Sequence, residues 1–119
     1  MEDSLVLQKS LDFAVRVFRL CRYLSDEKRE YVLSKQLLRS GTAVGAILRE
    51  AKYAQSKKDF ISKNSMALKE ASETQYWLEL LHKAEVLNEI EFDSIYADAC
   101  ELTRLLTSIV KTAKAGSPV

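Results

Sequence analysis

The sequence contains few of the residues that interrupt regular structure. It has three glycines and a single proline, Pro118. Glycine and proline are the strongest breakers of helices and strands, so their scarcity predicts long helices over almost the whole length. At 119 residues the chain has the size of one ordinary domain, and it needs no metal or disulfide to build its core.

Cysteines and long apolar runs are scarce as well. Cys21 and Cys100 are isolated rather than joined in a Cys-x-x-Cys pair, and we expect both to be thiols that pack within or beside helices. Charged residues interrupt every candidate apolar span, and Met1-Glu2-Asp3 carries no basic region ahead of an apolar stretch. We therefore expect no signal peptide, no transmembrane helix, no membrane partner and a cytoplasmic location.

The chain has no large excess of either charge, since its net charge is +1, but basic and acidic residues are unevenly distributed along it. Residues 1–69 hold 14 basic and 8 acidic residues, whereas residues 70–119 hold 4 and 9, so the two parts carry +6 and −5. Such a division is typical of an anion-binding face, and equally of complementary helices that attract one another inside a bundle. Both interpretations stay open at this point.

The first predicted helix runs from about Ser4 to Leu24 and is apolar over more than half of its circumference. A four-helix core needs a narrower apolar face. The excess predicts a second packing partner, which in so short a chain is most economically another subunit. The residues expected at this subunit interface are Phe13, Val17, Leu20 and Leu24. Arg16 and Arg19 belong to the polar strip of the same helix.

The second predicted helix has Ser34 as its N-cap and carries Gly41 and Gly45 beside its apolar stripe. Each glycine costs about 1 kcal/mol of helix propensity relative to alanine, and close packing against another helix is the expected compensation. A phosphate-cradling glycine loop would need a preceding strand, which the pattern does not supply. The opposite side of this helix gathers a basic stripe with one aromatic residue: Lys35, Arg39, Arg49 and Tyr53.

A basic hinge separates the second predicted helix from the third. Ser56, with Asp59 three residues later, is typical of a capping box that starts a helix. Lys57 and Lys58 lie at this start, where cations oppose the helix macrodipole unless an anionic partner binds. The hinge is therefore either an anion-binding point or a solvated turn.

Asn88 and Glu91 form a second capping pair, which opens the fourth predicted helix. Four long amphipathic helices with short connections predict an all-α fold, an up-down-up-down antiparallel four-helix bundle in a single domain. We expect the bundle to occupy residues 1–115 and residues 116–119 to form a flexible C-terminal tail. Asn64 falls in the apolar row of the third helix, where an interior polar residue that fixes packing is more expected than a catalytic group.

Catalytic and metal-binding constellations are scarce. Glu79-x-x-His82 has the spacing found in di-iron bundle proteins, but such a site needs a second Glu-x-x-His helix and the chain has a single histidine. No Ser-His-acid or Cys-His arrangement has a recognisable spacing. We therefore expect a protein that is not an enzyme and that binds neither a metal nor a cofactor.

Two segments carry a resemblance to a known family. They are QLLRSGTAVGAILREA, which begins at Gln36, and DFISKNSMALKEASETQYWLELL, which ends at Leu81. They resemble the small four-helix-bundle proteins encoded in intervening sequences of bacterial 23S rRNA genes, a family that is related to the accessory variability determinant of diversity-generating retroelements. The resemblance extends from about Phe13 to Lys111, and Ile47 departs from it because relatives often carry Asn there.

The resemblance implies a non-enzymatic bacterial homo-oligomer, a pentamer, that binds RNA or a nucleic-acid-handling protein such as a reverse transcriptase. Carried over to this chain, it implies nucleic-acid contacts at Arg16, Arg19, Lys35, Arg39, Arg49, Lys52, Lys57 and Lys58. The residues themselves add Tyr53 as a stacking platform on the same helix face. The alternative is a protein-interaction scaffold that binds no nucleic acid and uses its divided charge for assembly.

Overall fold

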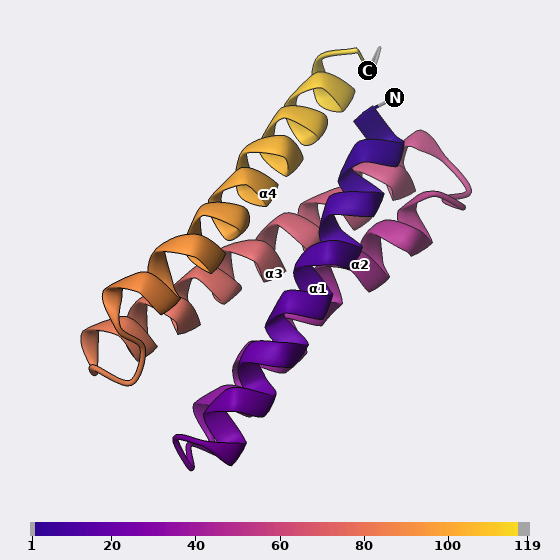
Figure 1. Cartoon of the computed structure of the whole chain (residues 1–119). Helices are drawn as coiled ribbons and strands as arrows, with labels where there is room; N and C mark the ends of the chain where they lie inside the picture. Colours follow the sequence, from indigo (N-terminus) through magenta and orange to yellow (C-terminus); the bar gives the residue numbers. More distant parts are fainter. Residues whose placement is uncertain (1, 117–119) are drawn as a thin grey trace.

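The computed structural model describes residues 2–116, with side chains from Leu5 onward. This part of the chain forms four helices and no strand: α1 (Glu2–Asp26), α2 (Leu33–Ala51), α3 (Lys57–Lys83) and α4 (Glu89–Ala115). Consecutive helices run in opposite directions, and the start of α1 lies at the same end as the end of α4 (Figure 1). The predicted all-α four-helix bundle is confirmed. Of the predicted C-terminal tail only Gly116, which caps α4, lies among the described residues.

Seen in cross-section, the four helices lie at the corners of a square. α1 contacts α2 and α4, and α3 contacts the same two helices from the other side. The core between them is aliphatic and holds Leu37, Val44, Leu78, Leu81 and Leu106, none of which reaches solvent. Within the described residues, no helix is both long and apolar enough to cross a lipid bilayer.

Two helix starts have the predicted caps. At α3, the Ser56 Oγ accepts a hydrogen bond from the Asp59 N–H at 3.0 Å. The predicted capping box is only half formed there, because the Asp59 Oδ2 accepts from the Gln55 N–H at 3.3 Å rather than from the Ser56 N–H. At α4, the Asn88 Oδ1 accepts from the Glu91 N–H and the Glu91 Oε1 accepts from the Asn88 N–H, both at 2.8 Å. Each pair satisfies N–H groups that have no partner within the helix.

The predicted N-cap at Ser34 is wrong. α2 begins at Leu33, and its first N–H groups donate to the carboxylate of Glu30: Ser34 N to Oε1 at 2.7 Å, and Leu33 N to Oε2 at 3.0 Å. The Ser34 Oγ is turned inward and donates to the Glu30 carbonyl at 2.8 Å. A carboxylate is the better acceptor here because the helix macrodipole favours negative charge at this end.

The residues predicted to form a subunit interface on α1 lie inside the bundle instead. Phe13 is 2% exposed, and Val17 and Leu24 are fully buried in the core. Leu20 is partly buried and packs against that core. The prediction is wrong because the wide apolar arc of α1 has two sides, and these residues occupy the inward one. The outward side carries the exposed residues Leu11, Val15 and Phe18.

The two glycines of α2 have different surroundings. A Cβ atom built at Gly41 would lie 2.8 and 2.9 Å from the two Cγ atoms of Val17, closer than side chains can approach. Gly41 therefore permits the close packing of α2 on α1, as expected from its cost in helix propensity. At Gly45 an added Cβ would lie 3.4 Å from the nearest atoms of Ser10, which is an ordinary contact. Close packing does not require a glycine at that position.

Candidate nucleic-acid interface

The outward side of α2 carries exposed basic and aromatic residues. Lys35 and Arg49 are exposed along it, and Tyr53, in the turn that follows, is 73% exposed. α2 contains one carboxylate, Glu50, which is turned toward α3 and pairs with Lys63 at 3.2 Å. The surface, here called the outer α2 face, consists of Lys35, Thr42, Ala46, Arg49 and Tyr53. Its positive charge and single ring suit contact with a polyanion.

Arg39, predicted as a contact residue, is held by two carboxylates of α3. Its Nη1 donates to the Glu70 Oε1 at 3.1 Å, and its Nη2 donates to the Glu73 Oε2. The Glu73 carboxylate also accepts from the Trp77 Nε1 at 2.9 Å. The hydrogen bond from Trp77, followed by that from Arg39, lowers the pKa of Glu73. Arg39 therefore joins α2 to α3, and its charge is largely balanced within the bundle.

Arg16 and Arg19 leave α1 on the side of α4 and are not part of the outer α2 face. Arg16 pairs with Asp98 of α4, and its Nη2 donates to the Ser94 Oγ at 2.9 Å. Arg19 is exposed and lines a groove of about 360 Å³ between α1 and α4, together with Leu20. The structure thus divides the predicted contact residues between two surfaces.

The α2–α3 hinge, residues 52–58, places further predicted contacts next to Tyr53. The Lys52 Nζ lies 5.6 Å from the centroid of the Tyr53 ring. The Lys57 Nζ donates to the Gly116 carbonyl at 3.0 Å, so this lysine is tied to the end of α4. Lys58 is exposed and makes no ion pair with another described residue. Lys52 and Lys58 therefore extend the outer α2 face, whereas Lys57 is partly engaged.

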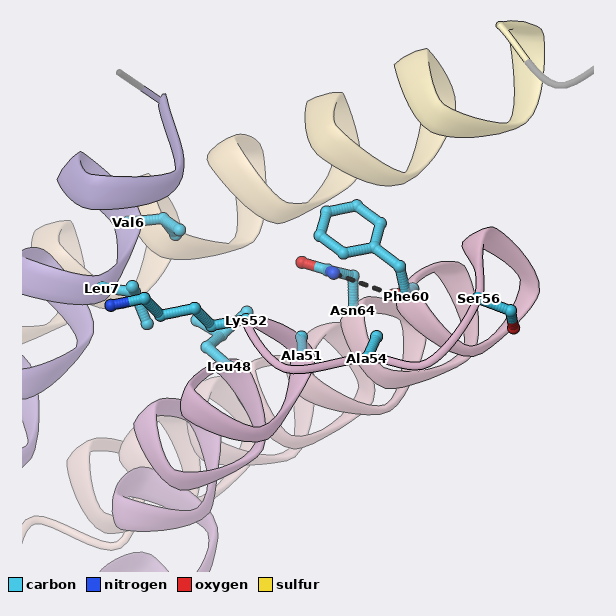
Figure 2. Close-up of a pocket in the computed structure, with 9 residues that line it drawn as sticks. All are labelled: Val6, Leu7, Leu48, Ala51, Lys52, Ala54, Ser56, Phe60 and Asn64. Carbon is cyan, nitrogen blue, oxygen red and sulfur yellow. Dashed lines mark hydrogen bonds between the residues drawn. The ribbon is translucent and has the colours of Figure 1, made fainter.

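A cavity of about 180 Å³ opens beside this hinge (Figure 2). Its walls come from the start of α1, the end of α2, the hinge and the start of α3: Val6, Leu7, Leu48, Ala51, Lys52, Ala54, Ser56, Phe60 and Asn64. Asn64 is 2% exposed, and its Nδ2 donates to the Phe60 carbonyl at 2.9 Å. The sequence predicted Asn64 as an interior polar residue, but periodicity alone gave no signal of the cavity that it lines.

The Glu79-x-x-His82 pair is engaged with α4 at the opposite end of the bundle. The Glu79 carboxylate accepts a hydrogen bond from the Tyr96 hydroxyl at 2.6 Å, which raises the pKa of Tyr96 to about 12. The His82 Nε2 lies 2.9 Å from the Glu89 Oε1, and its ring stacks on Phe92 with centroids 4.1 Å apart. Across the described residues, no group of three His, Cys, Asp or Glu side chains is placed to hold a metal ion.

The exposed apolar residues of α1 form a row beside α2. Leu11, Val15 and Phe18 recur at helical spacing, and the Arg22 guanidinium lies 5.7 Å from the centroid of the Phe18 ring. One shallow groove between α1 and α2 is lined by Leu11 and Arg49, and another by Phe18 and Lys35, so this row borders the outer α2 face. We call Leu11, Val15 and Phe18 the exposed α1 stripe. It accounts for the apolar excess that the sequence showed on this helix.

Comparisons with known proteins agree with this architecture. A family model described as 23S rRNA-intervening sequence protein matches residues 2–108. Among solved structures, a crystal structure of a protein of unknown function from the S23 ribosomal protein family of Bacteroides thetaiotaomicron is 52% identical. The alignment covers 93% of this chain and 99% of that one, with a TM-score of 0.91. No curated protein matches the chain.

Proposed function

Because the chain belongs to the 23S rRNA-intervening sequence protein family, we propose that it is a non-catalytic RNA-binding protein that works as a homo-oligomer in the bacterial cytoplasm. The name of the family refers to the place of its genes and states no activity. The proposal therefore depends on the surfaces of this chain, and above all on the outer α2 face.

One observation supports RNA binding most strongly. Lys35, Arg49 and Lys58 are exposed along one side of α2 and its hinge, and none of them pairs with a carboxylate in the described part of the chain. Other predicted basic residues, Arg16 and Arg39, are balanced by Asp98, Glu70 and Glu73. The bundle thus leaves positive charge unpaired on this side, next to the exposed ring of Tyr53.

The same arrangement indicates how RNA would be held. Lysine and arginine side chains contact phosphates without reading sequence, and an exposed aromatic ring stacks with any base. Binding should therefore be weakly sequence-specific and should prefer single strands, whose bases are free to stack. For single strands, each phosphate contact adds roughly 0.7 to the magnitude of the negative slope of log affinity against log salt.

Self-association is supported by the exposed α1 stripe. Three large apolar side chains in a row on one helix are typical of an interface, and Phe18 alone is 48% exposed. A second copy of the chain would cover this surface, and the family resemblance favours a pentamer. Each subunit of a ring would carry its own outer α2 face, bordering the subunit interface, so several weak contacts to one RNA would add together.

Charge reversal on the outer α2 face tests the RNA-binding proposal. The variant Lys35→Glu/Arg49→Glu should bind single-stranded RNA more weakly in a filter-binding assay and should reduce the salt slope by roughly 1.4, the contribution of two phosphates. The control is Lys83→Glu/Arg104→Glu, which changes net charge equally at exposed positions elsewhere. Equal losses in both variants would show that net charge, not this face, determines binding.

The second candidate function is a protein-interaction scaffold, and the exposed α1 stripe is the observation that favours it. A scaffold would assemble through apolar contacts and ignore RNA. Electrostatic binding should be strong at about 50 mM salt. If an intact oligomer binds neither structured nor single-stranded RNA under those conditions, the scaffold replaces the RNA-binding function.

A further inference from the structure

The cavity beside the α2–α3 hinge has the size of a single planar ring. Its volume is about 180 Å³, and apolar side chains such as Leu48, Ala51 and Phe60 form about half of its wall, with polar groups forming the rest. An apolar protein cavity of roughly 150 Å³ is large enough to bind benzene. The hinge cavity can therefore hold one six-membered ring or a small fused ring, but no larger ligand body.

A buried polar atom, the Asn64 Oδ1, points into this cavity. The Asn64 side chain is 98% buried, and the hydrogen bond from its Nδ2 to the Phe60 carbonyl fixes the amide so that the Oδ1 faces the cavity (Figure 2). The Oδ1 accepts no hydrogen bond from a described residue. It is not completely enclosed by protein atoms, so a molecule in the cavity can reach it. A buried acceptor that faces a cavity is satisfied only by a donor that enters the cavity.

The mouth of the cavity is positively charged. Lys52 and Ser56 line it, and Ser56 caps α3, whose first two residues are Lys57 and Lys58. The N-terminus of this helix of 27 residues adds the positive end of its macrodipole. The nearby carboxylate of Asp59, in the first turn of α3, accepts a hydrogen bond from the Gln55 N–H at 3.3 Å. An anionic group at the mouth would offset the repulsion among these cations.

We propose that the cavity accepts one unpaired nucleobase of a bound RNA. The base ring lies among the apolar walls and donates an amino or imino N–H to the Asn64 Oδ1, while the adjoining phosphate lies at the lysines of the hinge. All four RNA bases carry such a donor, so the site takes any base but requires that one be present. This inference rests on the proposed RNA-binding function, and it adds a specific anchoring point to a surface that otherwise binds only phosphates and stacks one ring.

Binding of single nucleotides separates the cavity from the rest of the surface. With isotope-labelled protein, uridine and adenosine monophosphates should shift the NMR signals of the Asn64 side-chain amide and of Phe60. Ribose 5-phosphate, which lacks the base, should leave those signals in place. If ribose 5-phosphate produces the same shifts, the hinge binds phosphate alone and the inference is wrong.

Two variants test the cavity within RNA binding. Asn64→Leu removes the acceptor at similar volume, and Ala54→Leu fills the cavity from the hinge, which keeps the test valid if the first variant is unstable. Each should weaken binding of a short single-stranded RNA about tenfold, or 1.4 kcal/mol. Ala84→Leu, at an exposed position at the other end of the bundle, should have no effect. An RNA with abasic sites should bind wild type and the two cavity variants equally.

The outcomes distinguish this inference from the proposed function. RNA binding that is unchanged in both cavity variants, with no nucleotide-induced shift at Asn64, would contradict the nucleobase site and leave RNA binding through the outer α2 face intact. Nucleotide binding in the cavity without any binding of RNA would support the site and contradict the proposed function. Absence of both would contradict both.

Discussion

Replacement of Gly41 by alanine probes the closest helix contact in the bundle. The new Cβ would lie 2.8, 2.9 and 3.2 Å from the Cγ1, Cγ2 and Cβ atoms of Val17. Valine is stiff about χ1 because two methyl groups branch from its Cβ, so it cannot turn aside cheaply. α1 and α2 must therefore separate by some tenths of an ångström along a buried seam.

The expected free-energy change follows from two opposing terms. Overpacking in a filled core costs about 1–3 kcal/mol, and replacement of a helical glycine by alanine gains about 1 kcal/mol in propensity. Gly41→Ala should therefore lower the free energy of unfolding by roughly 0–2 kcal/mol. Gly45→Ala has the same gain without the clash, since its Cβ would lie 3.4 Å from Ser10. It should raise the free energy of unfolding by about 0.5–1 kcal/mol.

Urea denaturation of the two variants measures this contrast, because the propensity term cancels in their difference. Gly41→Ala should be less stable than Gly45→Ala by about 1–3 kcal/mol. In a double-mutant cycle, Val17→Ala should restore part of the loss at Gly41, since it removes the two Cγ atoms. Equal stabilisation by both alanines would show that α1 and α2 do not approach as closely as the structure indicates.

Three further predictions concern assembly, pH and capping. Phe18→Glu should dissociate the proposed oligomer in light scattering with little loss of helicity. Phe13→Ala should instead lower the free energy of unfolding by about 3–5 kcal/mol, and dissociation by this variant alone would contradict the assignment of the exposed α1 stripe. Burial raises the pKa of the Cys21 thiol to about 12 from 9.0, so the unfolded chain loses this proton first as pH rises. The free energy of unfolding should therefore fall between about pH 9 and 12 by up to roughly 1.4 kcal/mol per pH unit, more steeply in wild type than in Cys21→Ala. Parallel curves of this free energy against pH for the two proteins would show that the Cys21 thiol is not the cause. Glu30→Ala should cost about 0.5–2 kcal/mol in denaturation, and no loss would mean that water replaces this cap.

Much of the fold could be predicted because it depends on local signals. The caps at Ser56 and Asn88 involve partners three residues away, so the sequence displays them directly. The cap of α2 was missed because its acceptor, Glu30, precedes the helix and competes with a serine that fits the usual pattern. A local rule ranks the serine first, but the folded connection brings the carboxylate closer to the free N–H groups.

The inward side of α1 and the partners of Arg39 could not be predicted for a different reason. Phe13 and Val17 are as apolar as Val15 and Phe18, and only the position of the neighbouring helices decides which pair is buried. The partners of Arg39, Glu70 and Glu73, are 31 and 34 residues away, and no spacing rule links them. The sequence could predict that a basic stripe on α2 is exposed. It could not predict which of these basic side chains lack an acidic partner, because that depends on the tertiary structure.

Photocrosslinking tests the central claim, that RNA is bound on the outer α2 face, most directly. Tyr53 on this face is 73% exposed and Tyr76 on α3 is 57% exposed, so two tyrosines of similar accessibility report on different surfaces of one molecule. Irradiation of the complex with a uridine-rich single strand, followed by mass spectrometry of the peptides, should place the nucleotide adduct at Tyr53 and not at Tyr76. Adducts at Tyr76 alone, or in equal yield at both, would contradict the claim.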